Sequence, residues 1–511
     1  MTGAGLIGVG MGPMLGPVDF LWKESRPGRF PRASPESQGV SSAAIRDFVA
    51  AANASGISWH SFMLLRHGHV VAEGWWSPYA ASFVHSLYSL SKSFTSTAIG
   101  LLVKEGKLDI HAKVVSFFPK DLPEQLPENL QLMTVRHLLT MNTGHGEDTM
   151  PKMSAASEPW VRTYLAQPVP YAPGSHFLYN TGNTYMLGAI LYQVTGLTLE
   201  QYLGPRLFQP LGISDYDWET SPQGLNTAGY GLRVKTEDIA RLGQLYLQKG
   251  KWGDAVILPA AWVEEATSYQ TSSQTGNADW SQGYGYQFWR CTHGAFRGDG
   301  AYGQYCIVMP EQDAVLAVTS QTPDMQHSLN IIWEHLLPGM QAGVLAENLP
   351  LSSELKKDLA ALSMPVVQGV LSSPLLSELN GKKWTIAENV FGVVSLVFSF
   401  STTGVQLAMG TVDKVATYTF GWEHWVLNGP REPYVFGVKG VFPMPSRVAG
   451  TATWMNEHTL QLNLRMVEAI FGDRILCTFD KELLSVSFLN SLAEVSKVED
   501  RRKGLEGRLS I

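Results

Sequence analysis

Charged residues are scarce in this chain of 511 residues, at 16% of the total against about a quarter in average soluble proteins. This scarcity excludes long solvated tails and long exposed helices, while 45% hydrophobic and 11% aromatic residues predict a large packed core. Acidic residues outnumber basic ones by 45 to 38, which leaves a net charge of −7. Such a chain has no overall attraction for phosphate backbones or anionic lipid, so we expect neither a nucleic-acid nor a membrane partner.

Cysteine is also rare, and Cys291, Cys306 and Cys477 are too few and too widely spaced for a disulfide framework or a metal motif. No H-E-x-x-H pattern and no paired C-x-x-C occurs, so neither a metal nor another cofactor is expected. No run of about twenty apolar residues is present, and the first residues lack a basic leading region and a cleavage site. Together with the sparse cysteines, these absences predict a cytoplasmic protein.

Changes in composition along the chain predict four parts. Residues 1–34 are apolar and glycine-rich and are expected to form a flexible leader, followed by a mixed helix-and-strand domain over 35–338. Residues 339–382, rich in Leu, Ser, Pro and Lys, predict a helix-containing linker. Short alternating segments separated by turn residues then predict a small all-β domain over 383–511. Its predicted strands are Ser395–Phe400, Thr417–Trp422, His424–Leu427, Thr451–Trp454, Thr459–Arg465 and Arg474–Phe479.

Within the first domain, hydrophobic spacing predicts a long helix from Ser89 to Glu105 that ends at Gly106. The segments 61–65 and 70–75 read as two strands joined by a turn. Three further strands are predicted near the end of the domain, at Ala295–Arg297, Tyr305–Met309 and Ala314–Ser320.

The pattern S-x-x-K occurs at the start of the long predicted helix, as Ser89 and Lys92. A spacing of three residues puts both side chains on one helix face, where a neutral lysine can take the proton of a serine nucleophile. A second match, Ser353 to Lys356, lies in the polar linker, where a solvated helix face explains it. The first match precedes a core helix of small and apolar residues, so it is the candidate nucleophile, with an ordinary capped helix as the alternative.

Further segments resemble the serine β-lactamase-related hydrolases, which include class C-type β-lactamases, penicillin-binding proteins, family VIII-type esterases, D-aminopeptidases and 6-aminohexanoate-oligomer hydrolases. The run Tyr88–Thr95 is similar to the first motif of this family. The other similar segments, in chain order, are Thr134–Gly144, Pro173–Asn180, Leu207–Ile213 and Lys235–Gly243. The resemblance covers roughly residues 35 to 338 and implies a sandwich in which helices flank an antiparallel sheet, with an added helical subdomain. Relatives that carry a C-terminal appendage imply a lipocalin-like or sandwich β-domain after it.

The resemblance also implies the second motif of the site. Tyr179 takes the position of the family's tyrosine, which lies beside the serine and shares the general-base role with the lysine. A phenol can act as a base only if nearby cations lower its pKa, and Lys92 is expected to do so. Thr181 stands where the family has the asparagine that binds the acyl-amide group of β-lactams, and Asn180 lies one place earlier. Both are candidate substrate contacts, and the displacement disfavours β-lactams more than hydrolysis.

The third family motif, K-T-G or H-x-G, is matched here by Gly298-Asp299-Gly300, which is expected to line the substrate site. Arg297 is the nearest cation and would bind a substrate carboxylate or support the lysine–tyrosine pair, unless it is an ordinary surface arginine. Ala301 would supply the second backbone N–H of an oxyanion hole, beside the N–H of Ser89.

The resemblance therefore implies a serine hydrolase that forms an acyl-enzyme on a small ester, amide or D-amino-acid peptide. The absence of G-x-S-x-G argues against an α/β-hydrolase. The alternative is a scaffold of the same fold with little or no turnover, which the altered second and third motifs would permit. His85 and His145 are also candidates for the lining of the cleft, with a structural role as the alternative for each.

Overall fold

The computed structural model describes residues 29–276, 278–437 and 444–510. Most of the predicted leader, residues 1–34, lies outside these ranges. Its described end, from residue 29, is packed rather than flexible: Phe30 is buried in the first hydrophobic core, and the Arg32 guanidinium lies 3.0 Å from the Glu73 carboxylate.

The first domain is built on a six-stranded antiparallel sheet with the order β2-β1-β11-β10-β9-β8. Its strands are β1 Ser58–Arg66, β2 His69–Trp75, β8 Trp289–Arg290, β9 Phe296–Gly300, β10 Gln304–Met309 and β11 Ala314–Gln321. The five predicted strands are confirmed, and the short edge strand β8 was missed. Because side chains alternate along a strand, β1 contributes Phe62 and Leu64 to one core and Met63 and Leu65 to another, so helices must cover both faces.

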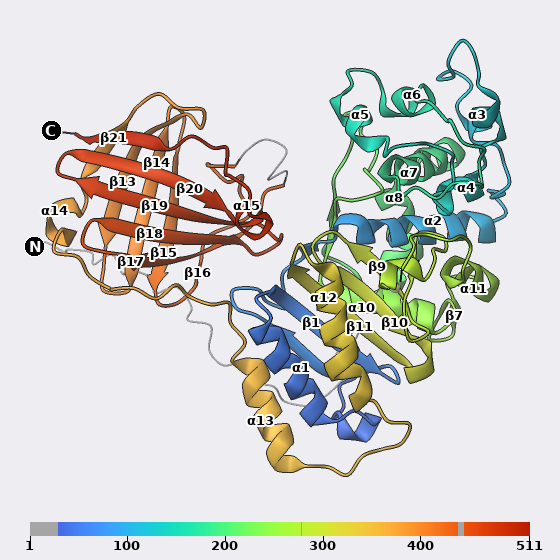
Figure 1. The fold of residues 1–511 in the computed structure, drawn as a ribbon, viewed down its shortest axis with the longest axis horizontal. Coiled ribbons are helices and arrows are strands. Elements are labelled where there is room, and N and C mark those ends of the chain that lie inside the picture. Colours follow the sequence, from blue (N-terminus) through green and yellow to red (C-terminus); the bar gives the residue numbers. More distant parts are fainter. Residues whose placement is uncertain (1–28, 277, 438–443, 511) are drawn as a thin grey trace, which may run out of the picture.

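Helices cover the sheet on both sides (Figure 1). On one face lie α1 Ser42–Ala54, α12 Met325–Ile331 and α13 Leu349–Ala360, and on the other lies α10 Thr236–Leu247. The helix α13 belongs to the predicted linker 339–382, yet it packs on α1, where Arg46 contacts the carboxylates of Glu354 and Asp358. Much of the linker is therefore part of the helical layer of the first domain.

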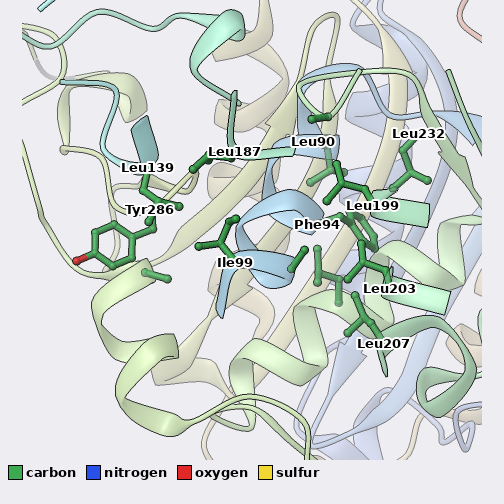
Figure 2. Packing of buried hydrophobic residues seen from close by; sticks show 14 of the residues in the cluster. Leu90, Phe94, Ile99, Leu139, Leu187, Leu199, Leu203, Leu207, Leu232 and Tyr286 are labelled. Atoms are coloured by element: carbon green, nitrogen blue, oxygen red, sulfur yellow. The ribbon is translucent and has the colours of Figure 1, made fainter. Parts of the chain in front are cut away.

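A second group of helices forms the helical subdomain expected from the resemblance (Figure 1). It contains α3 Glu128–Leu132, α4 Val135–Leu139, α5 Met150–Ala155, α6 Trp160–Leu165, α7 Thr181–Thr195 and α8 Leu199–Leu203. The helix α2, Ser91–Lys104, lies between this subdomain and the sheet and is buried from Ser91 to Leu102. Figure 2 shows Phe94 of α2 among Leu199, Leu203 and Leu207.

The predicted helix 89–105 begins two residues later than expected. Tyr88–Leu90 form a single 3₁₀ turn, η2, and α2 follows directly. The Ser91 hydroxyl donates to the carbonyl of Tyr88 at 2.6 Å and accepts a hydrogen bond from the Leu232 amide at 3.2 Å. The residue Ser89 therefore lies in a tight turn that is tied to the core on its C-terminal side.

The C-terminal domain is a ten-stranded sheet that closes on itself through a pairing of β15 with β17 and forms a barrel (Figure 1). The six predicted strands correspond to β13 Val393–Phe400, β15 Val415–Trp422, β16 Val426–Leu427, β17 Val448–Trp454, β18 Thr459–Met466 and β19 Gly472–Asp480. Four strands were missed, namely β12 Lys383–Ile386, β14 Gly404–Thr411, β20 Leu483–Asn490 and β21 Leu505–Leu509. Of these, β20 alternates between exposed and buried residues, so its pattern was readable in the sequence.

Among the described helices, none combines the length and the apolar character needed to cross a bilayer.

The burial of α2 generates a stability prediction. Phe94 is fully buried and packs on Phe208 with ring centroids 6.1 Å apart. Phe94→Ala removes this packing and leaves a cavity, so it should lower the free energy of unfolding by about 3–5 kcal/mol. Urea unfolding would measure it, with the exposed Val256→Ala as a control that changes the value by less than about 0.5 kcal/mol. Equal effects of the two changes would contradict a central position for α2.

Candidate active site

The side chains of the S-x-x-K pair meet at the start of α2. The Lys92 ammonium group lies 3.0 Å from the Ser89 hydroxyl oxygen. Ser89 is partly exposed, whereas the whole of Lys92 is only 1% exposed. Ser89 lies in the 3₁₀ turn η2 and Lys92 in the first turn of α2, which follows directly, and these successive turns bring the amine to the hydroxyl.

Burial determines the protonation of Lys92. Removal from water lowers the pKa of Lys92 to about 7, against the attraction of Asp148 and Asp299, which act to raise it. The amine donates to the carbonyl oxygen of Gly229 at 2.8 Å and lies 3.4 Å from the Thr181 hydroxyl. A large fraction of Lys92 is therefore neutral near pH 7 and able to accept a proton. Gly229 and Asp148 were missed in the sequence, because no motif links either of them to the serine.

Tyr179 is the third member of the group. The Lys92 amine lies 4.9 Å from its ring centroid, and the Ser89 hydroxyl acts to lower the pKa of its phenol. The ring stacks on Trp289 at 5.3 Å. Burial, helped by the charge of Asp299, raises the pKa of Tyr179 well above its ordinary value. The expectation that Lys92 lowers this pKa is therefore wrong, and the phenol keeps its proton at neutral pH.

The glycines of the third motif serve close packing. A Cβ atom on Gly300 would lie 2.0 Å from the carbonyl oxygen of Leu87, and one on Gly298 would lie 2.4 Å from the Ser93 hydroxyl. Only glycine lets β9 approach η2 and the first turn of α2 so closely. Both glycines are buried, so the prediction that they contact substrate is replaced by a packing role. Ala301, directly after β9, is exposed beside this contact, and its N–H remains a candidate oxyanion donor.

Arg297 and Asp299 form a buried ion pair. Arg297 is 0% exposed, and its guanidinium lies 2.9 Å from the Asp299 carboxylate and 4.3 Å from the Trp280 ring centroid. It is neither a surface arginine nor placed to meet a substrate carboxylate. Its charge instead compensates Asp299, whose carboxylate acts on Lys92 and Tyr179.

Asn180 also departs from its predicted role. Its side chain is fully buried and caps α7, accepting hydrogen bonds from the Gly182 amide at 2.9 Å and from the Thr149 hydroxyl at 2.8 Å. A capping asparagine that points into the protein cannot contact substrate. Thr181 remains at the site, where its amide donates to Asp148 at 3.0 Å and its hydroxyl faces Lys92.

The two histidines considered from the sequence lie elsewhere. His85 is buried and shares a 2.9 Å hydrogen bond with His60. His145 borders a separate cavity of about 200 Å³ together with Gln167 and Pro170. In the part of the chain that the structure describes, no three His, Cys, Asp or Glu side chains gather as a metal-binding group would require.

The comparisons of sequence with known proteins match mainly the first domain. The sequence model of the family described as Beta-lactamase matches residues 42–337, more than half of the chain. The 6-aminohexanoate-dimer hydrolase of Paenarthrobacter ureafaciens is 25% identical over 310 residues, which cover 56% of this chain and 77% of that protein. The beta-lactamase of Escherichia coli K12 is 24% identical over 223 residues, which cover 40% and 58% of the two chains. The solved octameric penicillin-binding protein homologue from Pyrococcus abyssi has a TM-score of 0.47 at 16% identity, covering 91% of this chain and 99% of its own.

The buried amine generates a prediction about stability. Because the pKa of Lys92 is lowered by folding, the unfolded chain binds the extra proton, and the native state is penalised below about pH 10. Lys92→Met removes this penalty but leaves the Gly229 carbonyl unpaired, so we expect a net gain of about 1–3 kcal/mol at pH 7. The gain should shrink toward pH 10.

Urea unfolding of both proteins at the two pH values measures this difference. Lys104→Met, at an exposed position of the same helix, is the control and should not raise stability at either pH. A Lys92→Met protein that is equally less stable at both pH values would contradict the burial argument.

Proposed function

The chain belongs to the beta-lactamase family of serine hydrolases, and we propose that it cleaves a small ester or amide through an acyl-enzyme on Ser89. The observation that carries this proposal is the buried Lys92 amine, 3.0 Å from the Ser89 hydroxyl and with a pKa of about 7. An amine with that pKa can both take a proton from a nucleophile and return it to a leaving group at neutral pH.

In the proposed reaction, neutral Lys92 accepts the hydroxyl proton as the Ser89 oxygen attacks the substrate carbonyl carbon. The carbonyl electron pair becomes an oxyanion, which the N–H groups of Ser89 and Ala301 stabilise. Collapse of this intermediate breaks the ester or amide bond, and the departing alcohol or amine takes the proton from Lys92. A water molecule then attacks the acyl-enzyme in the same way and releases the acid.

Tyr179 acts in this scheme as a hydrogen-bond donor. Its raised pKa keeps the phenol protonated, so it donates to the serine oxygen or to the leaving group while Lys92 serves as the base. This assignment differs from a base role shared between lysine and tyrosine, and it follows from the burial of the phenol beside Asp299.

The proposed substrates are small esters and amides. The similar protein from Paenarthrobacter ureafaciens is named for a 6-aminohexanoate dimer, which is a small linear amide. β-Lactams are disfavoured, because Asn180 is used to cap α7 and Thr181 replaces the amide side chain at the site.

A non-catalytic scaffold is not favoured. Burying a lysine without an ion pair costs free energy, and a protein with no use for the amine would be more stable with an apolar residue there. Ser89 is also only partly buried, in contrast to Lys92.

The nucleophile can be identified with a fluorophosphonate, which reacts with activated serines. Intact-protein mass should show one adduct on the unchanged protein and on Ser353→Ala, and none on Ser89→Ala. Ser353 is a matched control, because it belongs to the second S-x-x-K and lies exposed on α13. An adduct that persists in Ser89→Ala would refute the assignment of the nucleophile.

The pKa of Lys92 predicts the pH dependence of hydrolysis. Because only the neutral amine can act as base, kcat/KM for a p-nitrophenyl ester should rise about tenfold per pH unit below pH 7 and level off above it. Initial rates from about pH 5 to pH 9 measure this profile. A profile that is flat through pH 7 would exclude Lys92 as the base.

A further inference from the structure

The C-terminal barrel contacts the chain just before the nucleophile. The turn between β18 and β19, residues 467–471, reaches the first domain, where the Ser86 amide donates to the Glu468 carbonyl at 3.0 Å. The Tyr79 hydroxyl donates to the carbonyl of Ala469 at 3.2 Å. Val467 of this turn is buried in a core cluster formed mainly by first-domain residues. The barrel is therefore docked three residues from Ser89.

Charged groups reinforce this docking. The fully buried carboxylate of Glu468 pairs with Arg447 and, at 2.8 Å, with Arg431. Arg431 also lies 3.4 Å from Asp217 of the first domain, which binds Arg233 at 2.7 Å. Glu468 thereby holds Arg431 where it reaches across to the first domain, and these charge-assisted hydrogen bonds give the contact a defined geometry.

Two tyrosines connect the barrel to the site. Tyr88 directly precedes Ser89, and Tyr302 directly follows Ala301. Both have positive φ angles, 50° and 68°, which are strained for residues with a Cβ atom. Their rings meet edge to face at 5.8 Å, and both pack against the hydrophobic core of the barrel.

Strained backbone persists only where the surroundings hold it. The carbonyls of Tyr88 and Tyr302 are held within the first domain, by the Ser91 hydroxyl at 2.6 Å and the Thr322 amide at 3.0 Å. Their side chains are held by each other and by the barrel. We propose that the C-terminal barrel positions the oxyanion hole, by clamping the Tyr88–Tyr302 pair so that the N–H groups of Ser89 and Ala301 point to one place. This inference rests on the proposed function. Tyr88 and Tyr302 are positioning residues in it, since they act through the neighbouring backbone.

The consequence is an effect on the transition state rather than on substrate binding. Oxyanion donors act on the charge that develops during the reaction, so their misplacement lowers kcat and leaves KM nearly unchanged. Loss of one whole donor costs about 100- to 1,000-fold in kcat. A displaced donor should cost less, and we expect about a 10- to 100-fold loss for Tyr88→Ala and for Tyr302→Ala.

The test uses the full chain and a p-nitrophenyl ester. We would measure kcat and KM for Tyr88→Ala and Tyr302→Ala, and the inhibition constant of an alkyl boronic acid, whose serine adduct imitates the tetrahedral intermediate. The expected result is a fall in kcat, a matching loss of boronic acid affinity and a KM within about threefold of the original. Tyr88→Phe and Tyr302→Phe keep the rings and should restore both values. Tyr269→Ala, at a tyrosine that is 61% exposed, is the control.

A rise in KM at constant kcat would overturn the proposal, because the rings would then only line the substrate site. Unchanged kinetics in both alanine variants would overturn it as well. The barrel is tested separately by Glu468→Gln, which weakens the buried ion pairs and should reproduce the fall in kcat. Glu494→Gln, at a surface ion pair with Arg474, is its control. A Glu468→Gln protein that melts at a lower temperature but keeps its kcat would show that the barrel does not act on the site.

The failure of this inference can be separated from the failure of the proposed function. If the unchanged protein gives no fluorophosphonate adduct at Ser89, the proposed function itself fails. If the adduct forms but the alanine variants react and turn over normally, only the role of the barrel and its tyrosines fails.

Discussion

The burial of one amine is the constraint on which the site depends. Lys92 lies at the start of a helix with almost no contact with water, and its partners are a backbone carbonyl and a serine hydroxyl rather than a carboxylate. A close carboxylate would have stabilised the charged form and left the amine unable to accept a proton at neutral pH. The charges of Asp148 and Asp299 act to raise the pKa of Lys92, but the effect of burial prevails.

The surrounding architecture maintains this burial. The helix α2 is enclosed by the sheet on one side and by the helical subdomain on the other, so its first turn is held as firmly as its centre. Close packing of β9 through Gly298 and Gly300 closes the site from the sheet side. The Asp299 carboxylate would be a destabilising charge there, but the equally buried Arg297 compensates it.

The barrel contacts the first domain next to the candidate site. The turn 467–471 of the barrel binds the segment before the nucleophile, and the barrel core packs on the tyrosines next to both candidate oxyanion donors. The buried carboxylate of Glu468 holds Arg431 within the barrel, and Arg431 in turn reaches Asp217 of the first domain at 3.4 Å.

Local patterns in the sequence determined a good part of this protein. Short strand-like segments predicted five strands of the first sheet, and three-residue spacing predicted that Lys92 meets Ser89. Contacts formed on folding, by contrast, turn Asn180 inward to cap α7, bury Arg297 and place the carbonyl of Gly229 against the lysine. The physical reason is distance along the chain. Spacing and alternation describe neighbours, whereas burial, ion pairing and the pKa values that follow from them arise between residues that only folding brings together.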